Sequence, residues 1–272
     1  MRIAVIGDIG GHLDELRAEL RILGVEREGR LPDDLAVVQV GDLVHRGPES
    51  DAVVELVGIY LDDNPGRWIQ LIGNHEALYL RTPEFHWPEQ IGKAAAKTLR
   101  KWWKQGKPVG AAAIVTADES FLVTHAGVTA GFWSAVLDAP GTPGEAAARL
   151  NRLARSGDAA FFSPGLMLTG RANPYAGPIW AESSRELIPG WADATMPFSQ
   201  VHGHSGLVDW QGSDASVPAP GAVIMSADFY GKHATVWIAG QRIVGVDPGH
   251  GREAVKPWRS FVVEGYLDPG PS

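Results

Sequence analysis

The sequence of 272 residues contains no cysteine. Disulfide bonds and thiolate metal sites are therefore excluded, and the fold must be held together by packing, which fits a reducing cytoplasm. No stretch approaches the roughly 18 consecutive apolar residues that a membrane helix needs, and the chain does not open with a cationic region followed by a long apolar segment. We therefore expect a cytoplasmic protein that does not enter a membrane.

Positive charge is also scarce. The chain has 24 Lys and Arg against 32 Asp and Glu, which gives a formal net charge of −8. This acidity argues against a dedicated nucleic-acid or anionic-membrane binder. Hydrophobic residues make up 44% and charged residues 21% of the chain, values typical of a globular protein that is long enough to bury a sizeable core.

Five short apolar runs end in a polar residue that can bind a metal. They are RIAVIGD (2–8), LAVVQVGD (35–42), RWIQLIGNH (67–75), SFLVTHAG (120–127) and FSQVHGHS (198–205). Such runs are typical of strands buried on both faces, and the segments between the first three have helical spacing, so the chain is predicted to begin as βαβαβ with a parallel sheet. The carboxyl ends of parallel strands share one edge of the sheet, so we expect the five polar ends to converge there.

Further elements complete an α/β chain with mixed sheets. Helices are predicted at 13–23, near 51–61, at 90–106 and at 142–158, the last opened by a capping-box pattern of Thr142 and Glu145. Hairpins are predicted around residues 118–119 and around residue 240, and the Pro/Gly/Ser-rich stretch 212–222 is typical of a surface loop. We find no internal repeat and expect a single domain over residues 1–272.

Seven of the nine histidines lie within or beside the predicted strand ends. They are His12, His45, His75, His125, His202, His204 and His250. A single histidine beside a glycine is usually a hydrogen-bonded core or surface residue, but here the group is accompanied by Asp8, Asp42 and Asn74. Imidazole and carboxylate ligands together suit borderline divalent ions such as manganese, iron or zinc.

The ordered blocks GDIGGH (7–12), GDLVHRGP (41–48), GNHE (73–76), THAG (124–127) and HGHS (202–205) resemble the signature of the calcineurin-like metallophosphoesterases. The branch they resemble most contains serine/threonine phosphoprotein phosphatases and symmetrical diadenosine tetraphosphatases. VGVDPGHG (244–251) is similar to a late loop of the same branch. The resemblance implies a four-layer αββα sandwich with two mixed β-sheets, and it leaves residues 83–108 as a helical insert or lid.

The resemblance also implies a dinuclear site and a role for each motif. In that family two divalent ions share a bridging carboxylate, and a bridging hydroxide attacks the phosphoester without a covalent intermediate. His75 resembles the general acid that protonates the leaving oxygen, and Arg46 resembles the arginine that grips phosphate oxygens. The implied ligands are Asp8 at the first metal, Asp42 between both metals, and Asn74, His125 and His204 at the second.

Two departures from the family pattern lie close to the implied metals. Gly10 stands where the family has a histidine ligand, and His12 follows two positions later. Three alternatives stay open: the Gly10–Gly11 loop brings His12 to the metal, water completes the first site, or His12 merely begins a helix. His45 stands where an acidic residue normally orients His75, so it supports a protonated His75 less well.

A third departure concerns the substrate. Glu182 stands where relatives often have a second phosphate-binding arginine, and Arg185 follows three positions later. His202 and His250 lie beside family motifs and are candidates either for metal ligands or for hydrogen-bond partners of the ligands. The expected enzyme is a metal-dependent hydrolase of phosphomonoesters, with phosphoserine or phosphothreonine in proteins as the leading substrate. The alternatives are a dinucleoside polyphosphate hydrolase and a degenerate relative that binds a phosphorylated ligand or a metal with little turnover.

Overall fold

The computed structural model describes residues 1–210 and 224–271, so the predicted loop at 212–222 lies outside the described residues. One sheet has five strands in the order β11-β1-β2-β3-β4. Its strands are β1 (Arg2–Ile6), β2 (Leu35–Gln39), β3 (Trp68–Leu71), β4 (Pro108–Val109) and β11 (Phe261–Glu264). Strands β1 to β4 are parallel and β11 is antiparallel to β1, which confirms the predicted parallel start of the chain.

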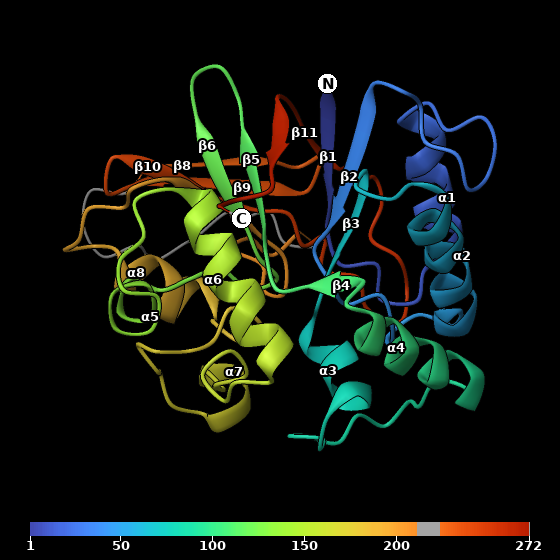
Figure 1. Ribbon diagram of the computed structural model, residues 1–272, viewed down its shortest axis with the longest axis horizontal. Helices are drawn as coiled ribbons and strands as arrows, with labels where there is room; N and C mark the ends of the chain where they lie inside the picture. The colour runs from blue at the N-terminus through green and yellow to red at the C-terminus, as the bar shows by residue number, and fades with distance from the viewer. Residues whose placement is uncertain (211–223, 272) are drawn as a thin grey trace.

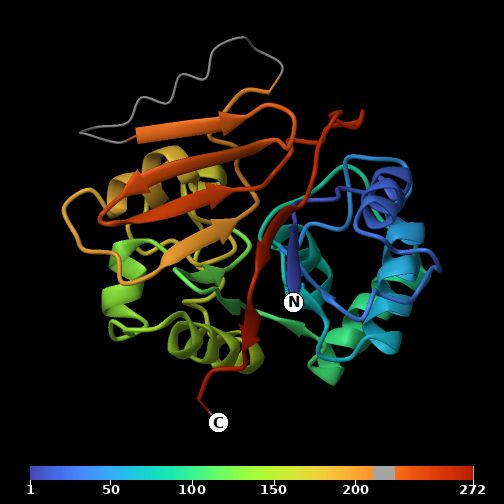
Figure 2. The same ribbon diagram turned by 90° about the horizontal axis from the view of Figure 1, so that it is seen from above.

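The second sheet has seven strands in the order β12-β5-β6-β7-β10-β9-β8. They are β5 (Ala112–Val115), β6 (Ser120–Val123), β7 (Ser199–His202), β8 (Ile224–Asp228), β9 (His233–Ile238), β10 (Gln241–Gly245) and β12 (Tyr266–Asp268). The pairs β5–β6 and β9–β10 are the two predicted antiparallel hairpins, while β6–β7 and β7–β10 are parallel. Near the C-terminus the chain pairs first with β1 and then with β5, so it passes from one sheet to the other (Figure 2).

The two sheets lie face to face, and alternation along β1 shows how the layers form. Ile3 and Val5 pack against Ile114 and Phe121 of the second sheet, while Ala4 and Ile6 face the helices on the other side. Because successive side chains of a strand point to opposite faces, both faces of β1 are buried. This alternation gives β1 the continuous apolar run seen in its sequence.

Helices cover the outer face of each sheet, as Figure 1 shows. On the five-stranded sheet lie α1 (Leu13–Ile22), α2 (Ser50–Asp63) and α4 (Lys93–Gln105), whose apolar faces form one core cluster with β1 and β2. On the seven-stranded sheet lie α5 (Ala130–Ala135), α6 (Pro143–Ser156), a π-helix (Ser183–Leu187) and α8 (Ile188–Gly190). Residues 1–210 and 224–271 hold two further helices, α3 (Asn74–Leu80) and α7 (Leu166–Thr169). The predicted four-layer αββα architecture is therefore confirmed.

The helix predictions agree with the structure to within a few residues. At the start of α6, the Thr142 hydroxyl accepts the N–H of Glu145 at 3.2 Å, as the capping-box pattern predicts. Trp102 of α4 is buried in the cluster that covers the five-stranded sheet, so this tryptophan is a packing residue. None of the described helices has the length and apolar character needed to span a membrane.

Candidate metal centre

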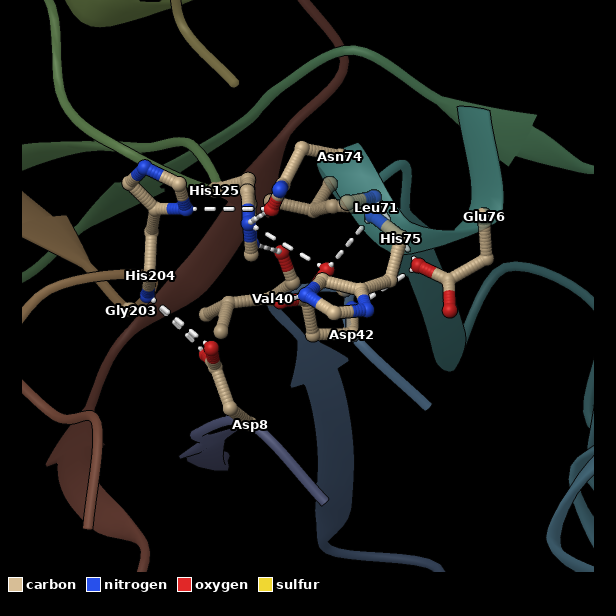
Figure 3. A network of polar contacts seen from close by, with 12 residues as sticks. Asp8, Val40, Asp42, Leu71, Asn74, His75, Glu76, His125, Gly203 and His204 are labelled. Atoms are coloured by element: carbon tan, nitrogen blue, oxygen red, sulfur yellow. Dashed lines mark hydrogen bonds and ion pairs between the residues drawn. The ribbon is translucent and has the colours of Figure 1, made fainter. Parts of the chain in front are cut away.

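The polar residues that follow three parallel strands of one sheet and two parallel strands of the other meet at one rim between the sheets, as Figure 3 shows. Within three residues of each strand end, one polar side chain points into the same space. The residues are Asp8 after β1, Asp42 after β2, Asn74 after β3, His125 after β6 and His204 after β7. The predicted convergence of strand ends is therefore present in the fold.

Asp42, His125 and His204 form a buried group in which one ligand atom from each residue lies within 4.8 Å of the others. Asn74 joins them, because its Oδ1 lies 3.0 Å from both His125 Nε2 and His204 Nδ1. One carboxylate, one amide oxygen and two imidazoles form a donor set that suits a borderline divalent ion. The residues present therefore fit the metal that the sequence predicts, although the individual ligand assignments stay predictions.

Electrostatics favour an ionised Asp42. Burial alone would raise the pKa of this carboxyl group, but the neighbouring His75, His125 and His204 outweigh burial and lower the pKa to about 2. His125 is itself oriented by a contact of 3.0 Å between its Nδ1 and the Val40 carbonyl. If Nδ1 bears the proton, Nε2 is left with a lone pair toward Asn74 and Asp42, which is the form that binds a metal.

Asp8 lies on the other side of the rim. Both of its carboxylate oxygens accept the backbone N–H of His204, each at 3.1 Å, and the residue is buried. Burial raises the pKa of Asp8 well above its usual range, and the negative charges of Asp247 and Asp42 raise it further. Several carboxylates crowded together in this way are stabilised by a cation placed between them.

The backbone around Asp42 is held by a residue that sequence reasoning missed. Asp42 has a φ of 52°, and the buried Glu76 side chain accepts the N–H groups of Asp42 (2.8 Å), Leu43 (2.8 Å) and Gly73 (3.1 Å). Burial raises the pKa of Glu76 to about 8, and the charge of Asp42 also raises it. A signal was available, because Glu76 lies three residues after Gly73 at a helix start, the spacing of a capping box.

His75 lies at the start of α3, with its Nε2 3.8 Å from Asp42 Oδ2. Its Nδ1 is 2.6 Å from His45 Nδ1, so the structure joins these two predicted residues directly. Burial lowers the pKa of His75, and burial also lowers the pKa of His45 to about 4. Arg46 has its guanidinium 5.6 Å from the centre of the Trp87 ring, at the edge of the same region.

The structure does not bring His12 into the group of Asp42, His125 and His204. Its Nε2 lies 2.9 Å from the Gly251 carbonyl oxygen, and its ring is 5.0 Å from that of His250. The reason is its position as the residue that precedes α1, where the turn of Gly10 and Gly11 directs it toward residues 250–251. His12 stands at the N-cap of α1, and its role as a ligand of the first metal stays a prediction.

The other departures also find places in the fold. Glu182 caps the π-helix by accepting the N–H of Arg185 at 2.7 Å, and Arg185 is exposed. His202 and His250 are both buried, and in each the Nε2 lacks a hydrogen-bond partner among the described residues. Neither histidine belongs to the ligand group found in the described part of the chain.

Comparison with known proteins gives a family match over more than half of the chain. The model of the calcineurin-like phosphoesterase family matches residues 1–160. A cold-active protein-tyrosine phosphatase of a psychrophilic Shewanella species is similar in structure, with 17% identity, 89% of this chain and 80% of that chain covered, and a TM-score of 0.45. A protein serine/threonine phosphatase from Saccharomyces cerevisiae, described as similar to human phosphatase PP5, has 15% identity, coverage of 92% and 68%, and a TM-score of 0.48. A metallophosphoesterase from Sphaerobacter thermophilus has 21% identity, coverage of 53% and 58%, and a TM-score of 0.32.

Proposed function

The chain belongs to the calcineurin-like phosphoesterase family, and from this premise we propose that it hydrolyses phosphomonoesters with two divalent metal ions bound at the rim between its sheets. Membership of this family makes it a metal-dependent hydrolase of phosphoesters. The observation that carries the proposal is the buried group of Asp42, His125 and His204, with Asn74 between the two imidazoles. Manganese, iron and zinc are the ions that this donor set suits.

Bound there, the ions would offset the negative charge of a phosphoryl group and lower the pKa of a bound water toward neutrality. Asp42, Asn74, His125 and His204 are proposed to hold the second ion. Asp8 is proposed to hold the first ion, and Asp42 would contribute to both sites.

The remaining proposed roles belong to groups that contact the substrate. His75 Nε2 lies on the same side as Asp42 Oδ2, at 3.8 Å, so we assign to His75 the hydrogen bond or proton given to the leaving oxygen. Arg46 is proposed to bind phosphate oxygens with its planar guanidinium. Phosphoserine and phosphothreonine in proteins are the proposed substrates, and the absence of cysteine supports a cytoplasmic setting.

The test is hydrolysis of p-nitrophenyl phosphate by protein that has been stripped of metal and then given manganese. Asp42→Asn removes the charge that faces both imidazoles, so the manganese-dependent rate should fall about a thousand-fold, the equivalent of several kcal/mol of lost transition-state stabilisation. Asp118→Asn is the matched control, because Asp118 is exposed in the turn between β5 and β6. Retention of the rate in Asp42→Asn would contradict the proposed site.

Substrate preference is measured on the same preparation. A phosphoserine peptide should be hydrolysed faster than diadenosine tetraphosphate, whereas the reverse order would favour a dinucleoside polyphosphate hydrolase. Metal binding without turnover of any of these compounds would identify a degenerate relative.

A further inference from the structure

Three side chains form a continuous polar chain that leads to the candidate metal centre. Tyr79 and His75 lie four residues apart in α3 and so share a face of the helix, and His45 lies between them. The Tyr79 hydroxyl is 2.6 Å from His45 Nε2, and His45 Nδ1 is 2.6 Å from His75 Nδ1. His45 and His75 are 1% and 3% exposed, so water does not replace these contacts.

The direction of the chain follows from its outer end. The backbone N–H of Ile91 donates to the Tyr79 hydroxyl oxygen at 3.3 Å and occupies one of its acceptor positions. Among the described residues, the remaining partner of this hydroxyl is His45 Nε2, the one group there that can accept its hydrogen. Burial raises the pKa of Tyr79, so the phenol keeps its proton at neutral pH.

The same reasoning continues through His45. A neutral imidazole has one donor and one acceptor nitrogen, and in His45 the acceptor position is taken by the tyrosine. Its proton is then on Nδ1, which faces His75 Nδ1. Burial lowers the pKa of His45 to about 4, and the resulting neutral ring fits these roles.

We propose that Tyr79 and His45 are positioning residues that hold the His75 imidazole in the tautomer with its proton on Nε2, facing the Asp42 carboxylate. This inference rests on the proposed function, since it concerns the group assigned to the leaving oxygen. An acidic residue at position 45 could only accept, so the hydrogen bond to His75 would run in the opposite direction and place a proton on Nδ1. The arrangement is therefore specific to a chain with histidine at this position.

Trp87 keeps both rings in place. Its indole stacks on His45 with ring centres 5.7 Å apart and 15° between the planes, and it meets the His75 ring edge-on at 4.5 Å. Because the packed rings cannot rotate, each keeps the same nitrogen toward its hydrogen-bond partner, and that partner determines which nitrogen carries the proton. The tautomer of His75 therefore depends on Tyr79, although the tyrosine lies one helical turn further from Asp42.

The tautomer is measured by nitrogen-15 NMR of histidine-labelled protein, kept free of metal so that the result does not depend on turnover. In the wild type we expect His75 to show a protonated Nε2 and an unprotonated Nδ1, with the opposite assignment for His45. Tyr79→Phe should abolish this fixed pair of assignments, and His45→Asp should move the His75 proton to Nδ1. Tyr266→Phe is the matched control, because Tyr266 is exposed on β12 and should leave all shifts unchanged.

Kinetics supply an independent readout. Loss of the fixed Nε2–H, which donates a hydrogen bond to the charge developing on the leaving oxygen, should lower kcat/KM for an alkyl phosphate about tenfold in Tyr79→Phe, a part of the 10²–10³ that one such preorganised donor contributes. The rate with p-nitrophenyl phosphate, whose leaving group needs no proton, should change less than about twofold. The proposal is overturned by a protonated His75 Nδ1 in the wild type, by unchanged shifts in Tyr79→Phe, or by equal losses with both substrates. In each of these cases, continued manganese-dependent hydrolysis would leave the proposed function intact.

Discussion

Gly203 provides a test of how closely the two sheets approach at the metal centre. A Cβ atom added to Gly203 would lie 2.0 Å from Asp8 Oδ1 and 2.7 Å from a methyl carbon of Val40. Since real Cβ contacts stay beyond 3.0 Å, the Asp8 carboxyl group must move by about 1 Å in Gly203→Ala. Its hydrogen bonds from the His204 N–H, at 3.1 Å, would then be lost.

The expected cost has two parts. Overpacking a buried site costs about 1–3 kcal/mol. The lost hydrogen bonding adds about 1 kcal/mol. We expect the free energy of unfolding to fall by about 2–4 kcal/mol, which corresponds to a Tm lower by about 5–15 °C in a protein of this size.

The assay is thermal unfolding with and without added manganese. Gly203→Ala should melt earlier than the wild type in both conditions, and manganese should raise its Tm less, because the displaced Asp8 binds the ion more weakly. Gly206→Ala is the control, since the nearest atom to its added Cβ is the Val208 carbonyl oxygen at 3.4 Å. A Gly203→Ala protein with the wild-type Tm and the wild-type response to manganese would refute the close approach of Gly203 to Asp8.

Two further predictions follow from the buried histidines. His12→Gln should change manganese affinity, measured by titration calorimetry, less than about threefold, because His12 lies against Gly251. His204→Gln should weaken manganese binding more than about a hundredfold, which exceeds the usual effect of losing a ligand's hydrogen-bond partner. Burial lowers the pKa of His202 to about 4 and that of His250 to about 3. Below the ordinary histidine pKa, the metal-free unfolded chain therefore binds more protons than the folded chain, and the free energy of unfolding decreases as the pH is lowered. The urea midpoint should therefore decrease from about pH 6.5 to about pH 4, with each of these two histidines contributing up to about 1.4 kcal/mol per pH unit.

Each of these predictions has a clear contrary result. Equal losses of manganese affinity in His12→Gln and His204→Gln would show that His12 is a ligand, as expected if the Gly10–Gly11 loop brings it to the metal. A urea midpoint that stays constant over the acid range would show that His202 and His250 become protonated without leaving the folded state.

Much of the fold was predictable because buried parallel strands have a simple sequence pattern. The runs that became β1, β2 and β3 are apolar on both faces, since each strand lies between a helical layer and the second sheet. The ligand group was predictable for the same reason, because parallel strands deliver the residues that follow them to one edge. Asp42 and His204, 162 positions apart in the chain, follow strands of different sheets, so the packing of the two sheets brings them into one group.

Contacts made by the connecting loops were not predictable. The position of His12 depends on whether the two preceding glycines, both of positive φ, turn it toward the rim or toward Gly251. Glycine can adopt the backbone conformations needed for either turn. The approach of Tyr79 and Trp87 to His45 required the loop after β2 to lie against α3 and the segment that follows α3. No periodicity in the sequence encodes that contact.

The sequence by itself determined the βαβαβ start with its parallel strands, the strand ends that carry the candidate ligands and the residue types that could bind a metal. These properties depend on local patterns of burial and on the common direction of parallel strands. Only the tertiary structure decided which ring nitrogen faces which partner, and that His45 meets Tyr79 as well as His75. Hydrogen bonds act over about 3 Å, and positions at that scale are set by the packing of loops against distant elements.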